Sequence, residues 1–342
     1  MKILFAIQGT GNGHLSRARD VYPELCKYGE VDVLISGIQA DVEVPFPVKY
    51  KMYGMSFIFG KKGGVDILET AKKTKLFKLI ADIRKFPIEQ YDLVINDFEP
   101  ISAWACKLKK KPCISLSHQM AVLSERAPKP TKSDWKGVTV LKYYAPVTDS
   151  YSFHFKSYAK NIFTPVIRKE IRETFPTNEG HYTVYLPAYD DEILVEHLTQ
   201  FESAQWKVFS KHNKKPFKTK NIEVQPIEND AFIKSMASGA GVLCGAGFEG
   251  PAEALFLGKK VMAIPMLEQY EQQCNAAALE SIGVPVIAQL STKYYDRIKW
   301  WLLYGDTVKV DYPDHIAKIV EQLMSEHAPQ YVTTRETLSV AV

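Results

Sequence analysis

A histidine and a carboxylate stand directly after two apolar runs of this sequence, and together they could carry out acid–base chemistry. His14 lies in the loop from Gly9 to Arg17, and Asp97 ends the run that begins at Asp92. An imidazole titrates near neutral pH, and a neighbouring carboxylate can fix its tautomer and stabilise its protonated form. We therefore expect His14 to act as a general base that Asp97 orients, with Glu99 as the rival carboxylate.

The loop that carries His14 is rich in glycine. Glycines permit a tight turn that brings backbone amides close to a ligand. A dinucleotide-binding loop would carry glycine or alanine at position 14 and an acidic residue at the end of the second strand, where this sequence has Ser36 and Gly37. A nicotinamide cofactor is therefore disfavoured, and we expect no cofactor. The residues expected to line the site on the side of this first loop are Gly11, Asn12, Gly13, Arg17 and His118.

Each of these polar residues also has a purely structural interpretation. His14 would cap a helix or bond within its own loop. Asp97 would cap a helix that starts near Pro100, because Asp is a favoured capping residue and Pro is favoured in the first helical turn. Arg17 either senses the charge of a diphosphate or lies on a solvated helix face, and His118 either lines the pocket or belongs to a polar loop. For Asp97 both interpretations stay open.

A second glycine-rich segment covers residues 245–250 and precedes Pro251. Proline is favoured in the first turn of a helix, since the amide it lacks would have no helical partner. The remaining free amides of such a turn, together with the helix dipole, form a binding site for an anion. We expect this site to hold a phosphate group at Gly245, Ala246, Gly247, Phe248, Glu249 and Gly250.

Short runs rich in β-branched residues alternate with longer helix-like segments, which is typical of parallel βα units. The charged segment from Thr164 to Gly180 contains two prolines and separates two such series, so we expect domains at 1–164 and 181–325, a linker at 165–180 and a tail at 326–342. Ligands bind beyond the carboxyl ends of the strands in open parallel sheets, so two facing sheets would frame one cleft. The expected strands are 2–7, 31–36, 48–53, 92–96 and 112–117, then 182–186, 207–210, 222–225, 242–245, 261–265 and 284–288.

Length and composition agree with two soluble globular domains. The chain has 342 residues, of which 46% are hydrophobic and 24% charged, and a net charge of +4. That charge is too small to indicate nucleic acid, whose binders concentrate Lys and Arg on one face. The 5 cysteines are scattered and mostly lie in apolar runs, as reduced thiols do, and no apolar run is long enough to span a membrane. We expect a cytoplasmic protein.

The two glycine-rich segments together make the sequence resemble the GT-B glycosyltransferases over nearly its whole length. The resemblance lies in the first loop with its histidine, and in the series from the second turn to Glu253, Gly258, Pro265, Gln272 and Asn275. It is nearest to the nucleotide-sugar transferases related to the peptidoglycan N-acetylglucosaminyltransferase and to a less characterised bacterial and archaeal glycosyltransferase family. It implies an α/β fold of two facing Rossmann-like domains with parallel sheets and a cleft between them.

The resemblance also implies roles for residues of the second half. Glu253 would accept hydrogen bonds from the ribose hydroxyls of a nucleotide, and Glu271 with Gln272 would bind the donor sugar. The nucleotide base would lie at Pro226 and Ile227.

The sequence departs from these relatives in two places. The second turn lacks the serine or histidine that contacts the diphosphate in many of them, so backbone amides would hold more of that group. Residues 186–191 stand where relatives of the peptidoglycan enzyme have a glycine-rich loop. What this loop binds is left open.

These observations predict a metal-independent, inverting glycosyltransferase that moves a hexose or N-acetylhexosamine from a nucleoside-diphosphate sugar, UDP-linked by resemblance, to an acceptor hydroxyl. The acceptor would be a saccharide, a lipid or a small molecule. No Cys and His cluster suggests a metal site, and Asp190 with Asp191 fits a helix cap better. Two alternatives stay open, a nucleotide-sugar 2-epimerase of the same fold and a catalytically silent nucleotide-sugar-binding protein.

One basic, amphipathic stretch bears on the location of the acceptor. The segment from Lys72 to Ile80 would either contact the inner face of the cell membrane as a peripheral surface or form a solvated helix.

Overall fold

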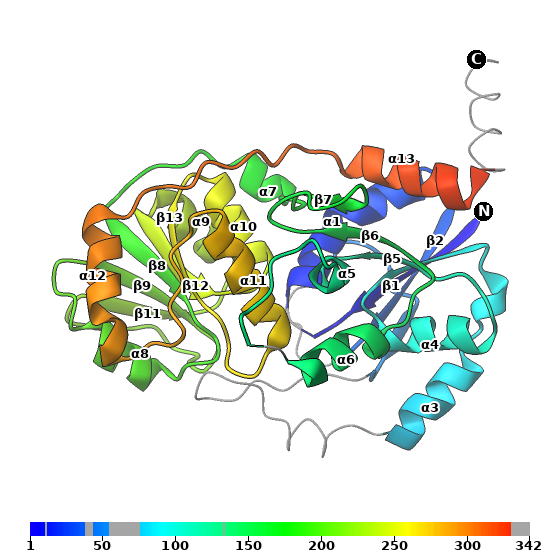
Figure 1. Ribbon diagram of the computed structural model, residues 1–342, viewed down its shortest axis with the longest axis horizontal. Coiled ribbons are helices and arrows are strands. Elements are labelled where there is room, and N and C mark those ends of the chain that lie inside the picture. The colour runs from blue at the N-terminus through cyan, green and yellow to red at the C-terminus, as the bar shows by residue number, and fades with distance from the viewer. Residues whose placement is uncertain (11, 38–43, 55–75, 133, 330–342) are drawn as a thin grey trace.

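Two sheets with helices packed on their faces stand side by side in the computed structural model (Figure 1). The structure describes residues 1–10, 12–37, 44–54, 76–132 and 134–329. Gly11, residues 72–75 of the basic stretch and the tail beyond residue 329 lie outside the described residues. Within the described part of the chain, no helix has the length and apolar character needed to cross a membrane.

The first sheet is 7-stranded, with the order β3-β2-β1-β4-β5-β6-β7 and parallel pairing throughout. Its central strands are almost fully buried, which explains their continuous apolar runs. The strands are β1 (Lys2–Gln8), β2 (Glu30–Ser36), β3 (Tyr50–Met52), β4 (Leu93–Asp97), β5 (Ile114–Ser117), β6 (Asp149–Phe153) and β7 (Ile162–Phe163). The helices between them are α1 (Gly13–Cys26), α3 (Leu76–Lys85), the 3-10 turn η1 (Ile88–Gln90), α4 (Pro100–Leu108), α5 (Gln119–Leu123) and α6 (Trp135–Tyr144).

The second sheet is 6-stranded, with the order β10-β11-β9-β8-β12-β13, and only its edge strand β10 runs antiparallel. The strands are β8 (His181–Tyr185), β9 (Gln205–Ser210), β10 (Phe217–Thr219), β11 (Ile222–Pro226), β12 (Gly241–Gly245) and β13 (Lys260–Ile264). The helices of this half are α8 (Asp191–Leu198), α9 (Asn229–Ser238), α10 (Glu249–Phe256), α11 (Tyr270–Ser281), the 3-10 turn η2 (Thr292–Tyr294) and α12 (Tyr295–Tyr304).

Most expected strands are present, with shifted ends, and the exceptions have local causes. The expected strand at 284–288 forms only an isolated bridge between Ala263 and Val286, because Pro285 has no amide to donate to a ladder. The strands β6, β7 and β10 were not expected. The sequence of β6 alternates polar and aromatic residues, and β7 covers only residues 162–163, so neither has the apolar run of a buried strand.

The chain returns to the first sheet after completing the second. The first sheet ends at Phe163, the short helix α7 (Lys169–Arg172) follows, and the second sheet begins at His181. The later helix α13 (Ile316–His327) packs against α1, as its position along the upper edge of Figure 1 shows. Residues 316–325, which the sequence analysis placed in the second domain, therefore pack with the first sheet.

The two halves approach each other closely where α6 meets α11. A Cβ atom added to Gly137 would overlap the side chain of Tyr270, at the start of α11, so this crossing needs a residue without a side chain. The contact fixes one wall of the space between the domains.

Replacing Gly137 with alanine should therefore force α6 and α11 apart. We expect the variant to lose about 1–3 kcal/mol of unfolding free energy, the typical cost of overpacking, in a urea titration followed by circular dichroism. Thr139→Ala, an exposed change on the same helix, is the control. Equal stability of the two variants would contradict the close approach.

Candidate active site

The structure places His14 and Asp97 in direct contact. Asp97 is the last residue of β4, and β4 pairs with β1, whose following loop leads into α1 and His14. The Nδ1 atom of His14 lies 2.8 Å from Oδ1 of Asp97. The carboxylate is 1% exposed, so its partners are fixed by the fold rather than by solvent. The Nε2 atom of His14 is thereby left to face other groups.

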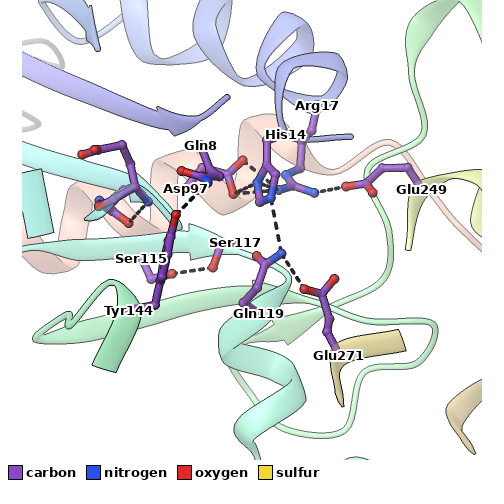
Figure 2. A network of polar contacts seen from close by, with 12 residues as sticks. Gln8, His14, Arg17, Asp97, Ser115, Ser117, Gln119, Tyr144, Glu249 and Glu271 are labelled. Carbon is purple, nitrogen blue, oxygen red and sulfur yellow. Dashed lines mark hydrogen bonds and ion pairs between the residues drawn. The ribbon is translucent and has the colours of Figure 1, made fainter. Parts of the chain in front are cut away.

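A buried arginine completes this contact and extends it to the second domain. Arg17 lies one turn after His14 on α1, and its Nη2 atom donates to both oxygens of Asp97 at 2.7 Å. Its Nη1 atom donates to Glu249, the first residue of α10 in the other domain. Figure 2 shows the guanidinium between the two carboxylates. Arg17 therefore belongs to this network and not to a solvated helix face.

The capping interpretation of Asp97 is wrong, because Glu99 caps the helix that follows. The Glu99 carboxylate accepts from the amides of Ile101 and Ser102 at 2.7 Å, at the start of α4. Between the two acids, Phe98 has a φ of 57°, a left-handed conformation that is uncommon outside glycine. This turn of the backbone separates Asp97, which contacts His14, from Glu99, which serves the helix.

Charge within the network sets the protonation of its members. Burial raises the pKa of Asp97, but Arg17 and His14 together lower it more, so the carboxyl is held ionised. Burial lowers the pKa of His14, but the Asp97 carboxylate outweighs burial and holds that pKa above its ordinary value. His14 can accept a proton only when it is neutral, hence only above this raised pKa.

A cavity of about 980 Å³ lies between the two domains and contains His14. The glycine turn of the second domain forms the opposite wall, through Gly247, Phe248 and Glu249. The first-domain lining also includes Gln8, Thr10, Gly13, Phe98, His118, Gln119, Lys132, Asp134, Trp135, Lys136, Gly137, Val140 and Leu141. The second-domain lining adds Glu268, Gln269, Tyr270, Glu271 and Gln273.

The glycine turn leaves room for a ligand at the start of α10. A Cβ atom added to Gly247 or Gly250 would meet no atom within 4 Å. The side chain of Asn275 holds the turn from behind, because its Nδ2 donates to the carbonyl of Ala246 at 3.1 Å. Glu249 places a carboxylate in the same first turn, where the helix dipole favours negative charge.

His118 joins the two walls of the cavity. Its ring stacks on Phe248 with centroids 3.9 Å apart and an interplanar angle of 3°. Its Nδ1 donates to the carbonyl of Phe153 at 2.8 Å, and its Nε2 lies 2.7 Å from Oδ1 of Asn275. Burial lowers the pKa of His118. The residue lines the pocket, and it also ties the end of β5 to the glycine turn.

Several predicted donor residues do not line the cavity. Glu253 is 3% exposed, and its two oxygens accept from Arg168 at 2.5 and 2.8 Å. Gln272 is buried and accepts from the amide of Met266 at 2.9 Å, whereas its neighbour Glu271 does face the cavity. The predicted donor residues Gly245, Ala246, Gly250, Pro226 and Ile227 are also absent from the cavity lining, and so is Asn12, which was predicted on the first-loop side.

The sequence analysis missed one wall of the cavity altogether. Lys132 and residues 134–141, at and before α6, contribute two lysines, a tryptophan and apolar side chains. Glu268 comes from the loop before α11 and has a φ of 61°, and Tyr270 is the first residue of that helix. The sequence signal that could have indicated this wall is a tryptophan, Trp135, flanked by Lys132 and Lys136. Over the described residues, no group of three His, Cys, Asp or Glu side chains is arranged to hold a metal ion.

Two Rossmann-like domains, with a carboxylate-paired histidine and a glycine turn on one interdomain cavity, define a GT-B glycosyltransferase. The chain belongs to the family described as glycosyl transferase family 1, which its sequence matches over residues 1–302. A comparison of the sequence with curated proteins finds no match.

Solved structures share this fold over almost the whole chain. MurG of Acinetobacter baumannii is 16% identical, with a TM-score of 0.52 over 95% of this chain and 99% of that one. The glycosyltransferase SnogD from Streptomyces nogalater is 14% identical, with a TM-score of 0.52 over 100% and 99% of the two chains. A UDP-N-acetylglucosamine 2-epimerase is 13% identical, with a TM-score of 0.56 over 96% of each chain. At these identities the likeness establishes the fold alone.

The raised pKa of His14 depends on its carboxylate partner, which a neutral substitution can test. In Asp97→Asn the imidazolium loses its counter-charge while Arg17 stays nearby, so the pKa of His14 should fall. NMR titration of the histidine ring signals measures this directly, with His181 of the second domain as the internal control. A His14 pKa that does not move would contradict the assigned pairing.

Proposed function

We propose that the protein is an inverting glycosyltransferase that transfers a hexose or N-acetylhexosamine from a UDP-linked sugar to an acceptor hydroxyl without a metal ion. The observation that carries this proposal is the placement of His14 and the glycine turn on opposite walls of one cavity. A proton acceptor and a site for a leaving anion thus lie on either side of the space where a sugar would react.

The donor would lie along the second-domain wall. The diphosphate would contact the free amides of the turn at Gly247 and Phe248, at the positive end of the α10 dipole. The donor sugar would meet Glu271, which faces the cavity, while Gln272 supports the loop that precedes it. The nucleotide base would extend toward Pro226 and Ile227, at the end of β11.

The reaction would proceed by a single displacement. The Nε2 atom of His14 takes the proton of the acceptor hydroxyl, whose oxygen forms a bond to the anomeric carbon. The bond from that carbon to the diphosphate breaks on the opposite face, and its electron pair leaves with the nucleoside diphosphate. The turn amides and the helix dipole stabilise the charge that develops on the leaving group. Asp97 stabilises the imidazolium that forms.

The acceptor would enter from the first-domain wall around α6. A saccharide, a lipid or a small molecule would each be compatible with the mixture of Trp135, Val140 and two lysines there. Elsewhere on the first domain, the helix α3 exposes Phe77 at 91%, with Leu76 and Ile80 beside it. This exposed apolar face supports a peripheral contact with a membrane as part of the proposal.

Removing the imidazole should abolish base catalysis and leave donor binding intact. We expect His14→Ala to lower kcat by about 10²–10⁴-fold, the usual contribution of a general base, with nucleoside-diphosphate affinity unchanged by calorimetry. Transfer is measured by product detection with a panel of UDP-sugars and acceptors. A large loss of nucleotide affinity with little change in kcat would refute the assignment of His14.

The ribose role of Glu253 is compatible with its ion pair, since a carboxylate offers about four acceptor sites and Arg168 uses two. Glu253→Ala should then weaken UDP binding by about tenfold or more, because hydrogen bonds to a charged group are among the stronger ones. Calorimetry measures the affinity and thermal melting the stability. Unchanged affinity with lowered stability would restrict Glu253 to its pairing with Arg168.

A 2-epimerase remains the second candidate, because such an enzyme shares the fold. Incubation with a sugar nucleotide and no acceptor would then yield the epimer, whereas a transferase gives at most slow hydrolysis. Binding without either product would indicate a silent binding protein.

A further inference from the structure

One residue of the first domain, Gln119, lies close both to His14 and to Glu271 of the second domain. Gln119 is the first residue of α5, which follows β5 after the single residue His118, and it is 4% exposed. Its Nε2 atom lies 3.4 Å from Nε2 of His14 and 3.3 Å from Oε2 of Glu271, on the other domain. Figure 2 shows this amide between the two groups.

The hydrogen-bond donors and acceptors of His14, Gln119 and Glu271 are complementary. His14 directs Nδ1 at the Asp97 carboxylate, so in the neutral ring the proton sits on Nδ1 and Nε2 carries the lone pair. The amide nitrogen of Gln119 has two protons, one for this lone pair and one for Glu271. The nitrogen that must accept a proton during catalysis is therefore already occupied by a donor.

Both contacts are long for hydrogen bonds, whose usual donor–acceptor distance is about 2.9 Å, so ligands can displace them. The Oε1 atom of Gln119 is buried and has no hydrogen-bond partner among the described residues. An incoming hydroxyl could therefore donate to this oxygen as it approaches His14. Gln119 has the contacts of a group that exchanges partners when substrates bind.

We propose that Gln119 is a positioning residue that occupies Nε2 of His14 until an acceptor hydroxyl displaces it, and so limits transfer of the donor sugar to water. This inference builds on the proposed glycosyl transfer. When the donor sugar engages Glu271, the amide loses one of its two anchors and the acceptor can replace it. In the side reaction, water loses a proton to His14, its oxygen bonds to the anomeric carbon, and the nucleoside diphosphate leaves with the electron pair.

The first test is the partition of a UDP-sugar between water and acceptor. Gln119→Met keeps the side-chain length but has no N–H, so hydrolysis relative to transfer should rise about fivefold, the effect of one hydrogen bond. Gln119→Asn, whose shorter amide cannot reach both partners, should act in the same direction and serves if the first variant fails to fold. Gln200→Met, on an exposed residue after α8, is the matched control. A ratio within twofold of wild type in a variant that still turns over the donor would overturn the inference.

The second test does not require any activity. An N–H donated to the lone pair of Nε2 stabilises neutral His14, so removing it in Gln119→Met should raise the pKa of His14 in an NMR titration. The charged groups that act on His14, namely Asp97, Arg17 and Glu249, are all retained. An unchanged pKa would overturn the bridge. A raised pKa with no transfer or hydrolysis of any UDP-sugar would instead retain the bridge and refute the proposed function.

Discussion

The geometry of the candidate active site depends on one buried cation, Arg17, held between carboxylates of two domains. Arg17 is 2% exposed and contacts Asp97 on its own domain and Glu249 on the other. A charge removed from water is tolerated only where partners compensate it, and losing one partner of a buried pair typically costs about 3–5 kcal/mol. A shift of the histidine relative to the glycine turn would separate Arg17 from one of these carboxylates, so such a shift costs free energy. The same charges set the protonation of His14.

The fold and the first half of this network could be predicted because they follow from local rules. Neighbouring parallel strands end at the same edge of a sheet, so residues after β1 and β4 had to be close. The sequence analysis chose Asp97 over its rival Glu99 as the partner of the histidine, but local rules could not establish that choice, since it depends on the left-handed conformation of Phe98. By residue type Asp97 would have been the better helix cap, yet Glu99 takes that place.

Other parts of the site depend on contacts between segments far apart in the sequence. Arg168 pairs with Glu253 across 85 residues, and nothing in the local sequence of either indicates that partner. The wall formed by Lys132 and residues 134–141 likewise acquires its place only when α6 packs against α11. Strand prediction failed for a similar reason at β6, where the polar Ser152 is buried between the neighbouring strands β5 and β7. Pattern and spacing reveal which side chains lie at strand ends, but not which of them find partners across the cleft.

The return of α13 to α1 means that the first structural unit is built from two separated pieces of chain. Consider a hybrid protein in which everything after about residue 180 is taken from a relative. In such a hybrid the relative's last helix, and not α13, would have to pack on the apolar side of α1. To exchange the second domain alone, two junctions are needed, one before β8 and one between α12 and α13. Recombination within this architecture is thus constrained by the last helix as much as by the linker.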